Sequence, residues 1–155
     1  MESVRFYESP LGTVRLVCEN GSLTELAFAE HREAESVSEV DEDTLSETVR
    51  WLDIYFSGRE PGFLPNMCLR GTDFQKRVWT ILSEIPYGRT CSYGDIAKEL
   101  AENGRKMSAQ AVGNAVGSNP IAIIVPCHRV IKTDGSLGGY AFGTDVKKKL
   151  LELER

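Results

Sequence analysis

The two halves of the chain carry different spacings of apolar residues, and this difference limits what they can fold into. In the first thirty residues apolar side chains alternate with polar ones, as in Val4 and Phe6 and again in Val14 and Leu16. Beyond residue 70 most of them recur every three or four positions, as on the buried face of a helix. We therefore predict an α+β protein with two lobes, an N-terminal one over residues 1–69 and a C-terminal one over residues 70–155.

The N-terminal lobe is predicted to be a small antiparallel sheet followed by a helix. Turn signals lie at Ser9-Pro10-Leu11-Gly12 and at Glu19-Asn20-Gly21. Residues 30–43 are acidic and poor in apolar side chains, so they predict a solvated loop or linker. Apolar residues at helical spacing follow, and Gly58 is expected to end that helix. They are Leu45, Val49, Leu52 and Phe56.

The C-terminal lobe is predicted to contain three short helices in a helix-turn-helix arrangement. The expected N-caps are Thr72 or Asp73, then Ser92, then Ser108, and the pair Asn103-Gly104 is expected to break the chain after the second helix. Small residues line the third helix, which suits either tight helix packing or entry into a minor groove only about 6 Å wide. They are Ala109, Ala111, Gly113, Ala115 and Gly117.

Charge is divided unequally between the lobes. Residues 1–69 carry a net charge of −9, whereas residues 70–155 carry +4, so the second lobe is the candidate for a polyanion partner.

No apolar run has the length of a membrane span, and the N-terminus lacks the apolar core of a secretory signal. The four cysteines are far apart without a Cys-x-x-Cys pair. Reduced thiols and a cytosolic or nuclear location are therefore expected.

An apolar run, residues 121–125, leads into Pro126-Cys127-His128-Arg129 and predicts a buried segment that ends in a polar cluster. A cysteine beside a histidine is a candidate nucleophile, because the thiolate is the reactive form and needs a base to accept its proton. If the segment is extended, the two side chains point to opposite faces, and a bridging water would have to connect them. The other histidine, His31, lies in the acidic stretch, so His128 is the candidate base.

The stretch Ile124-Val125-Pro126-Cys127-His128-Arg129-Val130 resembles the active-site motif of the O(6)-alkylguanine-DNA alkyltransferases. Further matching motifs follow the family's order over residues 71–154, and Ser9-Pro10-Leu11-Gly12 resembles the start of its N-terminal domain. The further motifs are Gly71-Thr72, Phe74-Gln75, Val78-Trp79, Ile85-Pro86-Tyr87-Gly88, Ser92-Tyr93, Ala111-Val112-Gly113, Asn119-Pro120, Gly138-Gly139-Tyr140 and Leu150-Leu151 with Glu154.

The resemblance implies a ribonuclease H-like N-terminal domain and a winged-helix-like C-terminal domain. It implies that Cys127 takes a methyl or other small alkyl group from O(6) of a flipped guanine, and from O(4) of thymine, in duplex DNA, once per molecule. Glu154 would orient His128, which would deprotonate Cys127 through water. Tyr93 would donate a proton or hydrogen bond to the leaving guanine, and Asn119 would support the active-site turn.

The resemblance also implies a set of DNA and substrate contacts, with no cofactor, no metal and a monomeric protein. Some relatives bind zinc in the N-terminal domain, but Cys18 and His31 are too few ligands for a closed site. The implied contacts are Ser92, Ala109, Gln110, Ala111, Arg129, Val130, Tyr140, Ala141 and Phe142, and the resemblance implies that Arg129 is largely structural.

Two positions depart from the family pattern. Gln110 stands where many relatives have an arginine that fills the space of the extruded base, so we expect weaker lesion binding or slower flipping. Ala141-Phe142 replaces a serine-glycine pair of some relatives. Phe142 is expected to crowd bulky adducts, which predicts a preference for methyl and other small groups.

Three other functions fit parts of the sequence. A non-enzymatic lesion-binding relative would lack the reactive cysteine, which is present here as Cys127. A helix-turn-helix regulator without chemistry would leave the cluster of Pro126 to Arg129 and Glu154 unexplained. A cysteine hydrolase would also pair a thiol with an imidazole, but it would turn over repeatedly.

Overall fold

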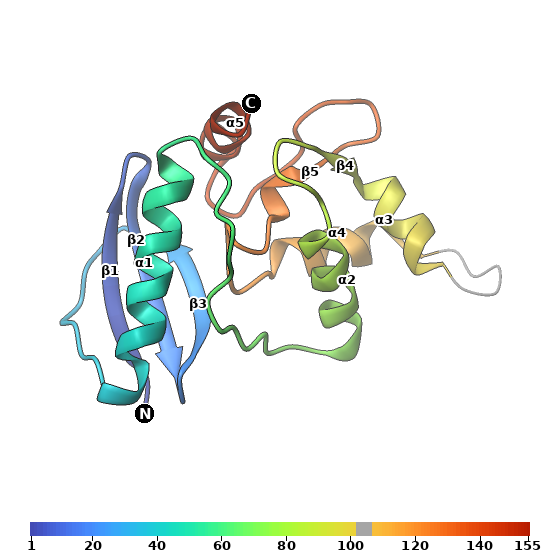
Figure 1. Ribbon diagram of the computed structural model, residues 1–155. Helices are drawn as coiled ribbons and strands as arrows, with labels where there is room; N and C mark the ends of the chain where they lie inside the picture. The colour runs from blue at the N-terminus through green and yellow to red at the C-terminus, as the bar shows by residue number, and fades with distance from the viewer. Residues whose placement is uncertain (102–106) are drawn as a thin grey trace. The chain divides into compact units, whose positions relative to one another are not determined.

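A computed structural model of the chain describes residues 1–101 and 107–155. The chain divides into two compact units, Met1–Arg70 and Gly71–Arg155 (Figure 1). The predicted α+β class is confirmed, and the predicted break at Asn103-Gly104 lies outside the described residues. None of the described helices is long and apolar enough to cross a bilayer.

The first unit contains a three-stranded antiparallel sheet in the order β1-β2-β3, built from β1 (Ser3–Ser9), β2 (Gly12–Glu19) and β3 (Ser22–Phe28). Both predicted turns are two-residue hairpin connections, since Ser9 pairs with Gly12 and Glu19 pairs with Ser22. Asn20 and Gly21 have φ values of 53° and 81°, the pair of positive values that a type I′ turn requires.

One helix, α1 (Glu42–Phe56), packs against this sheet (Figure 1). The predicted helix and its end are confirmed, because Gly58 with φ 87° follows the C-cap residue Ser57. The buried face includes Trp51 and Tyr55, whereas Val49 is only half-buried. The spacing of apolar residues therefore predicted the helix, but it included the half-buried Val49 in the buried face and omitted Trp51 and Tyr55.

The predicted solvated loop over residues 30–43 is confirmed for most of its side chains, which are exposed, but the stretch is also attached to the sheet at defined points. Ser36 and Val4 exchange two backbone hydrogen bonds of 2.8 and 3.2 Å. The stretch ends in a 3-10 turn, η1 (Glu39–Asp41), where the buried Asp41 carboxylate accepts hydrogen bonds from Ser3 Oγ (2.6 Å) and the Gly21 N–H (2.7 Å). These long-range partners, which composition does not reveal, hold the segment against the sheet.

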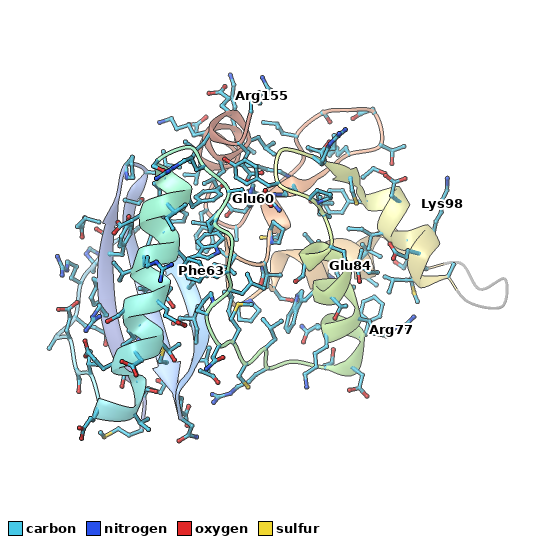
Figure 2. The ribbon with its side chains drawn as sticks, in the orientation of Figure 1. Glu60, Phe63, Arg77, Glu84, Lys98 and Arg155 are labelled. Carbon is cyan, nitrogen blue, oxygen red and sulfur yellow. The ribbon has the colours of Figure 1, made fainter. Side chains whose placement is uncertain are left out.

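The second unit contains three short helices that contact one another, α2 (Asp73–Ser83), α3 (Tyr93–Leu100) and α4 (Ala109–Gly117). The predicted caps are confirmed: Thr72, Ser92 and Ser108 each accept a hydrogen bond from the third backbone N–H of their helix. Charged side chains such as Arg77 and Lys98 point away from the helices (Figure 2).

The remaining elements place the Pro-Cys-His-Arg cluster inside this second unit. A short 3-10 helix, η2 (Cys127–Arg129), leads directly into β5 (Val130–Ile131), which pairs in parallel with β4 (Cys91–Ser92). The last helix, α5 (Thr144–Leu153), contacts η2. Residues 121–125 are buried as predicted, with exposed fractions of 7% or less.

Candidate active site

Cys127 is the first residue of η2 and follows a series of tight turns. The Ile124 N–H donates to the Ala122 carbonyl (2.7 Å), and the Cys127 N–H donates to the Val125 carbonyl (2.8 Å). Ile123 has a φ of 69°, which is rare for a β-branched residue. The segment is therefore not extended, because this run turns back on itself before Cys127.

Asn119 holds these turns together through its side-chain amide. Its Nδ2 donates to the Val125 carbonyl (2.7 Å), and its Oδ1 accepts from the Ile121 N–H (3.0 Å). The same side chain forms a hydrogen bond with Cys127 that favours the thiolate. Asn119 thus supports the turns that lead to Cys127.

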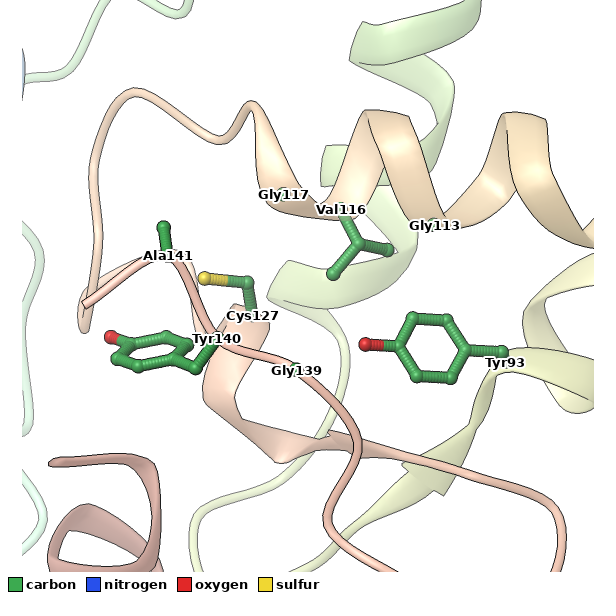
Figure 3. Close-up of a pocket in the computed structure, with 8 residues that line it drawn as sticks. All are labelled: Tyr93, Gly113, Val116, Gly117, Cys127, Gly139, Tyr140 and Ala141. Atoms are coloured by element: carbon green, nitrogen blue, oxygen red, sulfur yellow. The ribbon is translucent and has the colours of Figure 1, made fainter. Parts of the chain in front are cut away.

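The Cys127 thiol lines a cavity of about 220 Å³ (Figure 3). The hydroxyl of Tyr93 points into the cavity from its other end, and Val116 from α4 covers one side. Three glycines contribute bare backbone to the wall. The lining residues are Tyr93, Gly113, Val116, Gly117, Cys127, Gly139, Tyr140 and Ala141.

His128 lies next to the nucleophile candidate and is completely buried. Its Nε2 lies 2.6 Å from Oε2 of Glu154, which is 4% exposed and follows α5. Burial lowers the pKa of His128, although the Glu154 carboxylate opposes this effect. A neutral ring that donates from Nε2 to Glu154 carries its lone pair on Nδ1, which is the form able to accept a proton.

Arg129 is directed toward Glu154, which agrees with the largely structural role implied by the family resemblance, and its contact with DNA stays a prediction. Its Nε donates to Glu154 Oε1 (2.8 Å), its Nη2 to Glu154 Oε2 (3.2 Å) and its Nη1 to the Ile85 carbonyl (2.7 Å). Only 8% of Arg129 is exposed. The guanidinium therefore forms its hydrogen bonds inside the protein, where its positive charge compensates the negative charge of the buried Glu154 carboxylate.

The Cys127 thiol experiences opposing electrostatic effects. Burial raises its pKa, whereas the hydrogen bond from Asn119 and the positive charge of Lys147 lower it. The first effect is the largest, so the thiol needs a base to become a good nucleophile. The neutral imidazole of His128 is the group available on the same turn.

Lys147 is a functional candidate that sequence reasoning missed. It is fully buried on α5, and its Nζ donates to the carbonyls of Val130 (2.6 Å), Leu137 (2.6 Å) and Gly139 (3.0 Å). Burial lowers its pKa to about 8. The sequence carried one signal: Lys147 precedes Leu150 by three positions and Glu154 by seven, so all three lie on one helix face.

The pocket-wall residues divide into two groups. Tyr140 and Ala141 line the cavity, and the Tyr140 hydroxyl has no hydrogen-bond partner among the described residues. The ring of Phe142 packs edge-to-face on Tyr140 with a centroid separation of 5.5 Å, and Phe142 is not a lining residue. Phe142 therefore packs on a residue of the cavity wall, and its expected crowding of bulky adducts stays a prediction.

The other predicted contacts lie outside the cavity lining. Ser92 caps α3, while Ala109 and Gln110 are exposed in the first turn of α4 and Ala111 is half-buried there. Val130 is buried in β5; its N–H donates to the Cys127 carbonyl and its carbonyl accepts from Lys147. The structure thus does not bring Val130 to the substrate cavity.

Family models match both units of the chain. Residues 4–63 match the ribonuclease-like domain of 6-O-methylguanine DNA methyltransferase, and residues 73–155 match the DNA-binding domain of the same family. These two matches cover most of the chain and agree with the class predicted for each lobe.

Relatives along the whole chain carry the corresponding name. A methylated-DNA–protein-cysteine methyltransferase of Methanosarcina acetivorans is 43% identical over 151 residues, covering 96% of this chain and 95% of the relative. One from Mycobacterium bovis is 46% identical over 153 residues, with coverages of 97% and 91%.

Solved structures resemble the described fold. The crystal structure of Mycobacterium tuberculosis OGT in complex with DNA has a TM-score of 0.81 and 43% identity, covering 97% of this chain and 91% of that one. A Mycobacterium tuberculosis O(6)-methylguanine methyltransferase structure has a TM-score of 0.82 at the same identity, with coverages of 99% and 93%.

Proposed function

Because the chain belongs to the 6-O-methylguanine DNA methyltransferase family, we propose that it repairs alkylated DNA by moving a methyl or other small alkyl group from O(6) of guanine to Cys127. One observation supports this assignment above the others. The free thiol of Cys127 lines a cavity of about 220 Å³ and lies directly before the buried His128–Glu154 pair. A nucleophile, a group that can accept its proton and a space for a nucleobase ring thus occur together.

The transfer is a displacement at the alkyl carbon. The Cys127 proton passes to His128 through a bridging water, and Glu154 stabilises the resulting imidazolium. The thiolate sulfur forms a bond to the alkyl carbon while the carbon–oxygen bond breaks and its electron pair remains on the guanine. The thioether product is stable, so each molecule acts once. We propose that O(4)-alkylated thymine reacts in the same way.

Tyr93 is proposed to donate to the guanine as it leaves. Its hydroxyl points into the cavity opposite Cys127 (Figure 3). Burial and the nearby Cys127 raise the pKa of Tyr93, so the phenol keeps its proton at neutral pH and can give it, or a hydrogen bond, to the base. Neutralising the charge that develops on the leaving group lowers the barrier.

DNA is proposed to approach the exposed N-terminal turn of α4. The alkyl carbon is unreachable within the stacked duplex, so the damaged nucleotide must rotate into the cavity. The small residues of α4 suit a helix that enters the minor groove. We further propose a monomer without cofactor in a reducing compartment, the cytosol or nucleus, because the reaction consumes a free thiol and acts on DNA.

The stoichiometry of repair tests this function. A duplex that contains one O(6)-methylguanine is incubated with increasing protein. The remaining lesion is counted after the DNA has been digested to nucleosides. We expect one lesion to disappear per protein molecule and no further loss with time. Removal of several lesions per molecule would instead point to a turning-over hydrolase, and no removal would point to a binding protein without chemistry.

The Gln110→Arg variant is expected to bind a lesion duplex more tightly than the wild-type protein. A longer, charged side chain at this exposed position of α4 would fill the gap left by the flipped base and contact phosphate. Fluorescence anisotropy, with both proteins also carrying Cys127→Ala, measures binding without chemistry. A separate Asn114→Arg variant, at another exposed position of α4, controls for charge alone, and equal affinities with and without the Gln110→Arg change would contradict the wedge role.

Lys147 is expected to assist the transfer only while it is charged. Its pKa is lowered to about 8, so its positive charge near Cys127 is present below that pH and is lost as the pH rises through it. The ratio of the wild-type rate to the Lys147→Met rate should therefore fall from about pH 7 to about pH 10. Single-turnover rates with lesion DNA measure this ratio. A ratio that stays constant over the range would leave Lys147 with a purely structural role.

A further inference from the structure

The Tyr140 hydroxyl is a buried polar group that the described part of the chain leaves unpaired. Its oxygen is shielded from solvent, and none of the described residues forms a hydrogen bond with it. Buried hydroxyl groups in proteins are nearly always paired, either with protein atoms or with ordered water. A phenol in this position is therefore suited to hold a water molecule or a substrate atom inside the cavity.

This hydroxyl belongs to the part of the cavity that contains the nucleophile. Tyr140 and Cys127 line the same cavity, and the Tyr140 hydroxyl points away from Tyr93, on the Cys127 side (Figure 3). Burial raises the pKa of Tyr140, and a negative charge on the Cys127 sulfur raises it further. The phenol therefore keeps its proton at neutral pH, so it can donate a hydrogen bond but cannot serve as the base.

The position of the hydroxyl is fixed by contacts on both sides of Tyr140. The ring of Phe142 packs edge-to-face on the Tyr140 ring, with centroids 5.5 Å apart. The backbone is held by Lys147, whose Nζ donates to the Gly139 carbonyl (3.0 Å), and by Gly143, whose N–H donates to the Tyr140 carbonyl (3.0 Å). A donor held in this way can orient a water molecule, because little conformational freedom remains to be lost.

The proposed proton relay needs a donor of this kind. A water between Cys127 and His128 contacts two protein groups, whereas a buried water typically makes about three hydrogen bonds. Three other side chains interact electrostatically with the Cys127 sulfur, namely those of Tyr93, Tyr140 and Lys147. Lys147 directs its ammonium to three backbone carbonyls, and Tyr93 enters from the opposite end of the cavity. Tyr140 is thus the best placed of the three to supply the third contact.

We propose that Tyr140 is a positioning residue of the relay, and that its hydroxyl donates a hydrogen bond to the water between Cys127 and His128. The water oxygen accepts the proton of Cys127 Sγ while the water gives one of its own protons to Nδ1 of His128. The water is thereby regenerated, and a thiolate and an imidazolium are formed. Tyr140 keeps its proton throughout. The proposal rests on the proposed function and deepens its mechanism.

The test follows the Tyr140→Phe variant in two reactions of Cys127, methyl transfer from lesion DNA and alkylation by iodoacetamide without DNA. Both are measured by the mass of the peptide that contains Cys127. The variant keeps the aromatic ring, so at about pH 7 each rate should fall by about tenfold, the effect of losing one hydrogen bond in a charged network. The iodoacetamide rates of the two proteins should converge as the pH rises, because hydroxide then forms the thiolate without the relay.

Tyr93→Phe is the matched control, since it removes a hydroxyl from the other end of the same cavity. It should slow methyl transfer but not the iodoacetamide reaction, which has no guanine leaving group. In Tyr140→Phe the midpoint of thermal unfolding should not fall, because the lost hydroxyl has no partner among the described residues.

An iodoacetamide profile that Tyr140→Phe leaves unchanged overturns the proposal, and a fall in methyl transfer alone would then assign the hydroxyl to contact with the nucleotide. Equal slowing at every pH, or a clear loss of stability, overturns it as well, because either result indicates an altered cavity and not a weakened relay. Wild-type protein that takes no methyl group from lesion DNA overturns the proposed function, whereas the iodoacetamide profiles still decide whether Tyr140 supports formation of the thiolate.

Discussion

Replacing Glu154 with Gln is expected to lower the free energy of unfolding by about 3–5 kcal/mol and to slow alkyl transfer strongly. The carboxylate accepts from Arg129 through both of its oxygens and from His128 through one, and all three residues are buried. The neutral amide leaves the Arg129 charge buried without its counter-charge and removes the group that would stabilise a His128 imidazolium. Urea denaturation measures the first effect, and single-turnover transfer from lesion DNA measures the second.

The double variant Arg129→Met with Glu154→Gln separates these two consequences. Removing both charges should restore much of the stability lost in the single variant, because no uncompensated charge remains in the core. Transfer should stay slow, since His128 still lacks its carboxylate partner. A double variant as unstable as Glu154→Gln would contradict the ion-pair account, and one that recovers the full rate would contradict the relay through His128.

Replacing Tyr93 with Phe is expected to reduce the transfer rate by about 100- to 1,000-fold. The change removes only the hydroxyl that points into the cavity, so the aromatic ring that lines the wall is retained. The loss should therefore fall on the chemical step. Rapid-quench measurement of methyl transfer, at protein concentrations that saturate the DNA, isolates that step from binding.

The control for Tyr93→Phe uses the Cys127→Ala background, in which chemistry is absent. There, the affinity for lesion DNA should change far less than the transfer rate does in the reactive protein. If the rate falls by less than about tenfold, proton donation by Tyr93 contributes little. If affinity falls as steeply as the rate, the hydroxyl serves binding and the proposed role in the leaving-group step is wrong.

Features of the fold that depend on neighbouring residues were predictable from the sequence. The hairpin at Asn20-Gly21 follows from the positive φ values that its turn requires. The caps Ser92 and Ser108 satisfy backbone N–H groups at the start of their helices. The buried run before Cys127 follows from a continuous apolar stretch. Such causes act within a few residues, so they can be read without knowing the tertiary contacts.

Features that depend on distant partners were not predictable in this way. Most of residues 30–43 are exposed, as their composition predicts, but the burial of Asp41 depends on hydrogen bonds from the distant Ser3 and Gly21. The sequence also did not reveal the partner of Arg129, because Glu154 lies 25 residues away. The edge-to-face contact of Phe142 with Tyr140 also cannot be read from the sequence.

The candidate site falls between these cases. Adjacent Cys127 and His128 were identified from their chemistry, whereas Glu154, Tyr93 and Asn119 came from the family resemblance. The structure adds the distances that join His128 to Glu154 and Asn119 to the turn. It also adds Lys147, because the three carbonyls that surround its ammonium come together only in the folded chain.

Mass analysis of peptides from the reacted protein tests the central claim most directly. The protein is incubated with an excess of duplex containing O(6)-methylguanine, digested and compared with a sample given undamaged DNA. One methyl group should appear on the peptide that contains Cys127, while Cys18, Cys68 and Cys91 stay unmodified. A methyl group on any of those three, or no permanent gain in mass at all, would contradict the account.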